Sequence, residues 1–159
     1  MKKIGWKEKV CFPEFDLKDI PAKIDTGART SVLHCKSIII IKKYRKPYVK
    51  FVLLDPGMPE HNGKEYTLPF HKEKLVRNSF GQEENRIVIQ TEVELFNKRY
   101  PIEISLRDRS NMEFPMLLGR SFIRRNFIVD VSRSNQSARY KIRKLKQKKE
   151  SENSHSIKK

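Results

Sequence analysis

Apolar residues recur at every second position over much of the chain, the spacing that puts alternate side chains on one face of a β-strand. In residues 87–95 every odd-numbered position except Thr91 is apolar, while polar side chains occupy most of the even-numbered positions. Asn97-Lys98 then leads into another strand-like run at 99–106. This pattern predicts a β-hairpin whose first strand buries the apolar stripe of 87–95 in the core.

Shorter strand-like runs at 4–12, 20–24, 37–43 and 48–54 precede this hairpin. Turn residues cluster between the runs, notably in Asp55-Pro56-Gly57. Helical spacing is confined to one or two turns after Gly119 and to the basic C-terminal segment, without regular alternation of strands and helices. The pattern therefore predicts an all-β barrel, closed or half-closed, or a sandwich.

At 159 residues and 37% hydrophobic content, the chain is long enough for one domain with a real core. The first residues hold no apolar run of the kind found in signal peptides. The longest aliphatic run, Ile38–Ile41, is far too short to span a bilayer. We therefore expect a cytoplasmic protein with no membrane partner.

The formal net charge of +16 is concentrated toward the C-terminus. Residues 138–159 hold nine Lys or Arg against two Glu, a net charge of +7, which leaves +9 for the first 137 residues. We expect a domain at 1–135 followed by a basic, flexible tail at 136–159. The functional alternative for this tail is non-specific attraction to nucleic acid or to acidic partners.

Several kinds of catalytic site are excluded by spacing. A P-loop would need four residues between its glycines and a Ser or Thr after Lys64, but Gly57 and Gly63 are separated by five residues and Glu65 follows the lysine. No GxSxG elbow is present for serine catalysis. The candidate zinc ligands show no zinc-site spacing: Cys11, Cys35, His34, His61, His71 and His155. We expect no metal and no cofactor.

The stretch "AKIDTGARTS" delivers one carboxylate, Asp25, from the end of a strand-like run into a Thr-Gly turn. A single carboxylate is a weak base, but two carboxylates held about 3 Å apart share one proton and together activate water. Thr26 can lock the turn through its hydroxyl, and Gly27 lets backbone approach closely. The structural alternative is that Asp25 only closes an Asx-turn at the strand end.

Two stretches together resemble a known enzyme family. "IDTGA" and, about ninety residues later, "PMLLGRSFI" are similar to the two signatures of retropepsin-like aspartic proteases. The resemblance extends over roughly residues 4–133 to a bacterial family labelled ATP-dependent zinc proteases, which is now viewed as retropepsin-like. The matching stretches include "IGWKEKVCFPEF", "VRNSFGQEENRIVIQTEVEL" and "FIVDVS". The resemblance implies an all-β acid-protease barrel with one short helix after Leu-Leu-Gly-Arg, and an aspartic endopeptidase activity.

The resemblance also assigns roles to individual residues. It implies that Asp25 is catalytic, that an apolar strand passes beneath its loop, and that a mobile hairpin forms a flap over the substrate. The segment around Phe80 has the composition of a flap, although an ordinary loop explains it equally well. The loop-support residues are Thr26, Gly27 and Ala28, the strand signature is Leu117, Leu118, Gly119 and Arg120, and the candidate flap is Ser79, Phe80 and Gly81.

Only one of the six Asp residues, Asp25, is followed by Thr-Gly, so a peptidase of this type needs a homodimer that pairs two copies of Asp25. Its partners would be peptide or protein substrates. The alternative is a catalytically silent protease-fold module that binds acidic peptide or nucleic acid. One departure from the retropepsin pattern is Arg29, where an acid usually pairs with the later arginine. Arg29 and Arg120 would repel each other in that arrangement, so another acid, Asp108 or Glu113, would have to lie between them.

Overall fold

The computed structural model of the chain describes residues 1–54, 59–77, 80–109 and 112–157, and the side chains of all of these except 155–157. The elements, in chain order, are β1 (Lys2–Ile4), β2 (Lys7–Phe12), a short 3₁₀ helix η1 (Pro13–Phe15), β3 (Leu17–Asp25), β4 (Ser31–Lys43), β5 (Lys46–Leu53), β6 (Glu65–Pro69), β7 (Lys72–Arg77), β8 (Glu83–Leu95), β9 (Lys98–Arg107), β10 (Met116–Gly119), α1 (Arg120–Asn126), β11 (Phe127–Val129) and α2 (Gln136–Ile157).

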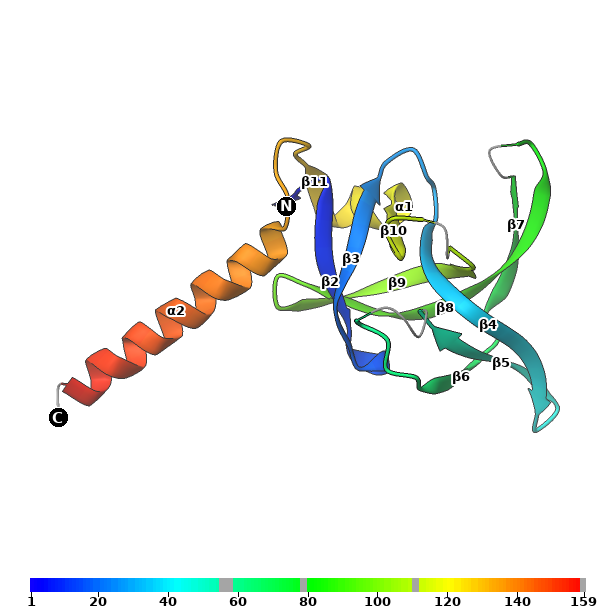
Figure 1. Cartoon of the computed structure of the whole chain (residues 1–159), viewed down its shortest axis with the longest axis horizontal. Coiled ribbons are helices and arrows are strands. Elements are labelled where there is room, and N and C mark those ends of the chain that lie inside the picture. The colour runs from blue at the N-terminus through cyan, green and yellow to red at the C-terminus, as the bar shows by residue number, and fades with distance from the viewer. Residues whose placement is uncertain (55–58, 78–79, 110–111, 158–159) are drawn as a thin grey trace.

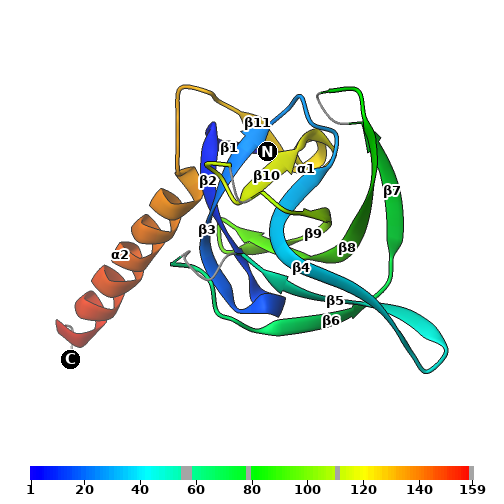
Figure 2. The same cartoon turned by 45° about the vertical axis from the view of Figure 1, so that its right-hand side comes forward.

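One nine-stranded sheet makes up the body of the molecule, in the order β10-β3-β2-β8-β9-β4-β5-β6 with β7 attached to β8. β10 also pairs with β4, so the sheet curls back on itself into a barrel (Figure 1 and Figure 2). A separate pair of short parallel strands, β1 and β11, lies at one end. The predicted all-β barrel is confirmed, and so is the short helix, α1, which begins at Arg120, the last residue of the Leu-Leu-Gly-Arg motif.

The hairpin predicted from the alternating pattern is formed by β8 and β9, which pair from Leu95 and Lys98 outward. Phe96 and Asn97, at its turn, have φ values of 55° and 58°. Positive φ at both central residues is the signature of a type I′ turn, whose twist matches that of the flanking strands. The odd-numbered residues from Ile89 onward are buried, as the stripe predicts.

β4 changes its surroundings along its length. Its first five residues, Ser31 to Cys35, are all buried because β9 and β10 pair with it on either side. Beyond Cys35 the strand pairs with β5, which pairs with β6 on its other edge. The end of this β4–β5 arm, residues 42–47, is exposed and projects from the barrel (Figure 1). The buried half of β4 therefore anchors the far end of the loop that follows Asp25 in the barrel wall.

The C-terminal segment is helical, as its spacing suggests. Helix α2 runs from Gln136 to Ile157. The buried carboxylate of Glu8 caps its first turn, because its oxygens accept hydrogen bonds from the backbone N–H groups of Gln136 (3.0 Å), Ser137 (2.9 Å) and Gly5 (2.8 Å). The division into a domain at 1–135 and a tail stays a prediction. No described helix is long and apolar enough to cross a membrane.

Candidate active site

Asp25 is the last residue of β3, and the loop that follows it folds back onto its carboxylate. Asp25 Oδ1 accepts hydrogen bonds from the backbone N–H groups of Gly27 (3.1 Å) and Ala28 (3.2 Å). The carboxylate is half-buried, whereas Thr26 and Gly27 are exposed. Two backbone donors on one oxygen fix the orientation of the carboxylate. A Cβ on Gly27 would lie 3.4 Å from Oδ1, an ordinary contact distance, so the space around this oxygen does not itself require glycine at position 27.

β10 passes directly beneath this loop. It runs parallel to β3, with Leu118 beside Ile24 and Gly119 beside Asp25, and antiparallel to the start of β4, with Leu117 beside Val32. A Cβ on Gly119 would lie 2.7 Å from a backbone atom of Thr30, so only glycine fits at this crossing. The strand signature predicted from the resemblance thus supports the Asp25 loop from below.

α1 continues from β10 and fixes the loop from the other side. The backbone N–H of Arg120 donates to the carbonyl oxygen of Ala28 at 2.8 Å, and the N–H of Ser121 donates to that of Arg29 at 3.1 Å. The Arg120 guanidinium donates to the carbonyl oxygen of Gly27 at 3.0 Å. A backbone carbonyl of the loop therefore binds Arg120, where the sequence led us to expect Asp108 or Glu113. Asp108 lies instead near His34, with Oδ1 3.8 Å from Nδ1.

The segment expected to form a flap lies between β7 and β8. Phe80 is 89% exposed and Gly81 has a φ of 76°, while Ser79 lies outside the described residues. The hairpin stands beside the Asp25 loop, because Lys74 Nζ on β7 donates to Thr30 Oγ1 at 2.6 Å. This position is compatible with a flap, and the role of the segment stays a prediction.

A cleft of about 760 Å³ opens between the Asp25 loop, β7, β9 and α1. Its lining residues are Arg29, Thr30, Ser31, Lys74, Pro101, Ile102, Glu103, Arg120, Ser121, Phe122, Arg124, Arg125 and Asn126, and we call it the cationic cleft. Five of these residues carry a positive charge and one, Glu103, a negative charge. That acid is already bound by His71 and Lys72 at 3.0 and 2.9 Å. The cleft therefore presents a net excess of positive charge beside the candidate catalytic loop.

The pKa values of two residues at this cleft reflect the local charges. The pKa of Lys74 is lowered, first by burial and then by the nearby positive charges of Arg29 and Lys72. The pKa of Glu103 is also lowered, because Lys72 and then His71 hydrogen-bond to its carboxylate. An anion that binds beside Lys74 would relieve the repulsion from its neighbouring positive charges.

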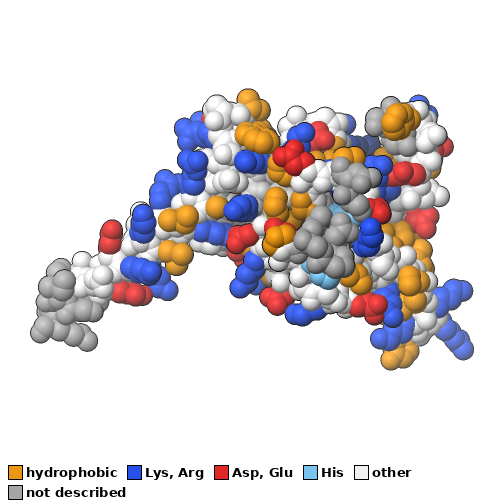
Figure 3. Space-filling view, in the orientation of Figure 1, with side chains coloured by type: hydrophobic (Ala, Val, Ile, Leu, Met, Phe, Trp, Pro, Cys, Tyr) orange, Lys and Arg blue, Asp and Glu red, His pale blue; other side chains and the backbone are white. Residues whose placement is uncertain are grey.

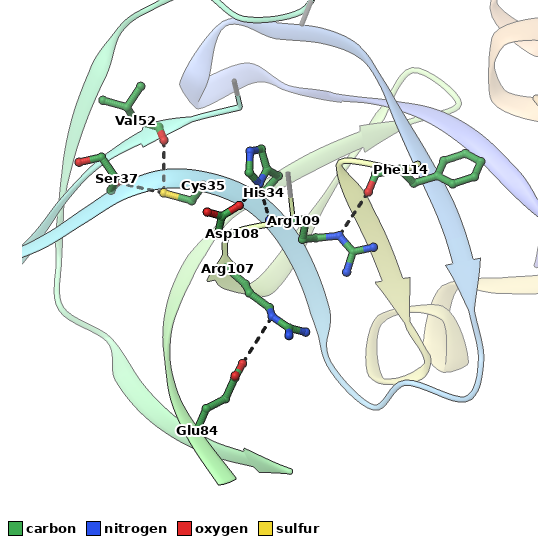
Figure 4. A network of polar contacts seen from close by, with 9 residues as sticks. All are labelled: His34, Cys35, Ser37, Val52, Glu84, Arg107, Asp108, Arg109 and Phe114. Atoms are coloured by element: carbon green, nitrogen blue, oxygen red, sulfur yellow. Dashed lines mark hydrogen bonds and ion pairs between the residues drawn. The ribbon is translucent and has the colours of Figure 1, made fainter. Parts of the chain in front are cut away.

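A polar network behind the loop involves residues whose role the sequence did not reveal (Figure 4). His34 on β4 is fully buried, and its Nδ1 accepts a hydrogen bond of 2.6 Å from the backbone N–H of Arg109. The Arg109 side chain is 7% exposed, and its Nε donates to the carbonyl oxygen of Phe114 at 3.2 Å. Burial lowers the pKa of Arg109, followed by repulsion from Arg107 and Arg86, while attraction to the Asp25 carboxylate opposes that shift.

Arg109 thus holds a buried positive charge whose field reaches the candidate catalytic carboxylate. The two arginines that flank Asp108 differ in their surroundings. Arg107 Nε lies 3.5 Å from Glu84 Oε1 near the surface, whereas Arg109 is buried behind the active-site loop. The role of His34 would have been recognisable only if its burial were known. That burial depends on the pairing of β4 with strands on both of its edges, which the local sequence does not reveal.

No group of three or more His, Cys, Asp or Glu side chains in the described part of the chain is arranged to hold a metal ion. Cys35 is buried, and burial raises the pKa of its thiol to about 12, which leaves it uncharged and a poor metal ligand near neutral pH. Asp130 accepts hydrogen bonds from the Ser132 N–H and hydroxyl, at 3.0 and 2.6 Å, and so shapes the turn after β11.

Three comparisons place the chain among known proteins. Curated relatives named "Probable alpha-L-glutamate ligase" come from Desulfotalea psychrophila, 33% identical over 81% of this chain, and Shewanella pealeana, 32% identical over 82%. The matched region is only 28% and 29% of the length of those proteins. A crystal structure of a Legionella pneumophila protein of unknown function shares the fold, with a TM-score of 0.67, 24% identity and coverage of 86% of this chain and 98% of that one.

The model of the RimB-like family, described as "Retropepsin-like aspartic endopeptidase RimB", matches residues 3–150. That range contains the Asp25 loop, β10 beneath it, the cationic cleft and the first half of α2. The resemblance inferred from "IDTGA" and "PMLLGRSFI" is thereby confirmed at the level of the family. The chain belongs to the RimB-like family of retropepsin-like aspartic endopeptidases.

Proposed function

We propose that the protein is an aspartic endopeptidase in which the Asp25 carboxylates of two copies activate a water molecule. The observation that carries the proposal is the geometry of Asp25. Its Oδ1 is held by two backbone N–H groups, while no described group is recorded as a hydrogen-bond partner of Oδ2. An oriented carboxylate with one oxygen still available is what a shared acid–base pair requires.

The proposed chemistry needs one proton shared by two carboxylates. The ionised Asp25 takes a proton from the water, whose oxygen attacks the peptide carbonyl carbon. The protonated Asp25 of the partner donates a hydrogen bond to the carbonyl oxygen as the tetrahedral intermediate forms. The proton taken from the water then moves to the leaving nitrogen as the C–N bond breaks. Because one carboxyl must be ionised and the other protonated, activity should be bell-shaped with pH, on the acid side of neutrality.

The exposed face of the loop supports a two-fold assembly. Thr26 and Gly27 are exposed at the tip of the Asp25 turn, so the turns of two copies can meet there about a two-fold axis. The net charge of +16 opposes self-association at low salt. Dimerisation is therefore expected to strengthen as salt screens the charges, or when an acidic substrate bridges the two copies.

The cationic cleft supports a preference for acidic peptides. Arg29, Arg124 and Arg125 line it, and its one acid, Glu103, is already bound by Lys72 and His71. Carboxylate side chains flanking the scissile bond would be attracted to this surface. The curated relatives are named for a ligase of glutamate, whose side chain carries that charge. We therefore propose peptides rich in Glu or Asp as substrates.

The direct test compares wild type with Asp25→Asn on a peptide library that includes acidic sequences. Asp19→Asn is the matched control, since Asp19 is exposed and its φ of 54° is one that Asn tolerates. Cleavage should be lost in Asp25→Asn and kept in Asp19→Asn. In a second arm, an excess of the Asp25→Asn chain is mixed with wild type. A dyad shared between copies predicts that activity falls as mixed dimers form, whereas an unchanged rate would refute the shared site.

The alternative is a catalytically silent module that binds acidic peptides, and the positive charge of the cleft favours it as well. The two functions separate in the same experiment. Binding of an acidic peptide by both wild type and Asp25→Asn, with no cleavage by either between pH 3 and 8, about the range over which paired carboxylates titrate, would favour the silent module.

A further inference from the structure

Helix α2 leaves the barrel after a short anchored stretch (Figure 1 and Figure 2). Its first two turns contact the barrel: Tyr140 packs against the ring of Phe96 with centroids 5.6 Å apart, and Lys141 Nζ lies 3.3 Å from Glu94. From Ile142 to Ser154 every side chain of the helix is exposed. We call residues 142–149, the first two turns beyond the barrel, the basic arm.

The basic arm carries an unusual density of positive charge. Its cations are Arg143, Lys144, Lys146, Lys148 and Lys149, and it contains no acidic residue. At 1.5 Å rise per residue the eight residues of the arm span about 12 Å, so the arm carries roughly one charge every 2.4 Å. The phosphates of a nucleic acid are spaced similarly, at about 1.7 Å per charge along a duplex and 3.4 Å along one strand.

The charges of the basic arm are available for a ligand. All five side chains are exposed, and Lys144 Nζ lies 5.5 Å from the ring of Tyr140. Figure 3 shows Lys and Arg side chains on both edges of the helix in this region. Because an α-helix has 3.6 residues per turn, five cations within eight residues are spread around most of its circumference.

This distribution favours a nucleic acid over a membrane surface. Helices that lie on membranes need a continuous apolar face opposite their cations. The basic arm has only Ile142 and Leu145, one turn apart, as apolar residues. A rod with cations on several sides can instead contact phosphates of a strand that wraps along it.

We propose that the basic arm of α2 binds the phosphate backbone of nucleic acid without reading its sequence. The cap formed by Glu8 fixes the direction of the helix, so the charges are held on a rigid element before binding and less freedom is lost when they bind. The arm points away from the Asp25 loop in both views of the barrel. Binding is therefore expected to be independent of the peptidase site, and the proposal does not rest on peptidase activity.

The test measures binding of a fluorescent single-stranded RNA of about 20 nucleotides, longer than the arm, by anisotropy at several salt concentrations. In the arm variant, Lys144, Lys146, Lys148 and Lys149 are changed to Gln, which keeps a good helix former at each position. In the matched control, Lys42, Lys43, Arg45 and Lys46 at the exposed end of the β4–β5 arm are changed to Gln. Each variant removes four charges and lowers the net charge from +16 to +12.

The expected effect follows from counterion release. If all five cations of the arm contact phosphates, wild-type affinity should fall about 100-fold between roughly 50 and 200 mM salt, at a slope of about −0.7 per contact. The arm variant, with one such cation left, should lose only about threefold over that range and bind more weakly at low salt. The control variant should keep the wild-type slope.

Three outcomes would overturn the proposal. The first is an arm variant whose affinity and salt slope equal those of wild type. The second is a control variant that loses as much affinity as the arm variant, which would show that only net charge matters. The third is preferential binding of wild type to vesicles of anionic phospholipid when RNA competes. Far-ultraviolet circular dichroism of each variant checks that α2 remains helical, so that lost binding reports lost charge.

Discussion

Gly119→Ala is the substitution whose effect the geometry of the candidate site predicts most sharply. An added Cβ would lie 2.7 and 2.8 Å from the carbonyl carbon and oxygen of Thr30, and 3.0 Å from the carbonyl oxygen of Arg29. All three are backbone atoms of the segment that leads from Asp25 into β4. Backbone cannot rotate away as a side chain can, so β10 or the Asp25 loop must shift.

The size of the effect can be estimated from overpacking. Forcing one extra carbon into a closely packed site costs about 1–3 kcal/mol. For a chain of this length, each kcal/mol lowers Tm by about 2–4 °C. We therefore expect Gly119→Ala to lower Tm by roughly 4–8 °C for a cost of about 2 kcal/mol. Since the shift acts on the Asp25 loop, cleavage of peptides should fall as well.

Gly27→Ala provides the matched control, because it adds the same atom to the same loop. Its Cβ would meet only Asp25 Oδ1, at 3.4 Å, an ordinary contact distance. Tm and activity should both change little, because the added methyl group makes only this ordinary contact. Differential scanning fluorimetry and a peptide-cleavage assay measure both quantities. A Gly119→Ala protein that melts within about 1 °C of wild type would refute the reasoning, since each kcal/mol is worth more than that.

Three further predictions concern other parts of the molecule. Changing both Arg124 and Arg125 to Gln should raise KM for an acidic peptide about fivefold, at ~0.5 kcal/mol per exposed charge, and leave KM for its Gln-substituted counterpart unchanged. In the native protein iodoacetamide at mildly alkaline pH should label the half-buried Cys11 and spare Cys35, whose pKa is raised to about 12; mass spectrometry reads the sites. Between pH 9.0 and about 12 the Cys35 thiol keeps its proton in the folded state but loses it in the unfolded state, so the free energy of unfolding should fall as pH rises through this range. Glu8→Ala should lower Tm by about 4–8 °C, since two or three backbone donors lose a buried acceptor at about 1 kcal/mol or more each, and an unchanged melting curve would contradict the capping role.

The parts of the fold that the sequence predicts are those specified by local pattern. The alternation at 87–95 and the Asn97 turn define the β8–β9 hairpin, because strand period and turn chemistry are both short-range properties. The Asp25 loop and the β10 signature were recognisable as motifs. Their contact, with Gly119 beside Asp25, follows from the family fold and not from any pattern within either motif.

The parts that the sequence did not predict depend on register between distant strands. The cap of α2 joins Glu8 to Ser137, 129 residues later, and nothing near either residue signals the other. The buried pair of His34 and Arg109 is separated by 75 residues. The cationic cleft likewise forms only when Lys74, on β7, is brought beside Thr30. From the charge pattern alone, the cations that line the cleft cannot be distinguished from cations on the solvated surface.

Arg29 shows how the departure from the retropepsin pattern and the charge of the cleft fit together. An acid at this position would pair with Arg120, but here the guanidinium of Arg120 binds the carbonyl oxygen of Gly27, which lies in the same loop. The loop therefore keeps its connection to α1 without that acid, and position 29 is left to carry a positive charge into the cleft. This charge is unfavourable in the empty protein, since it helps to lower the pKa of Lys74. An acidic ligand would relieve the repulsion, so the substitution that weakens the likeness to other retropepsins is the one that would suit the site to carboxylate-bearing peptides.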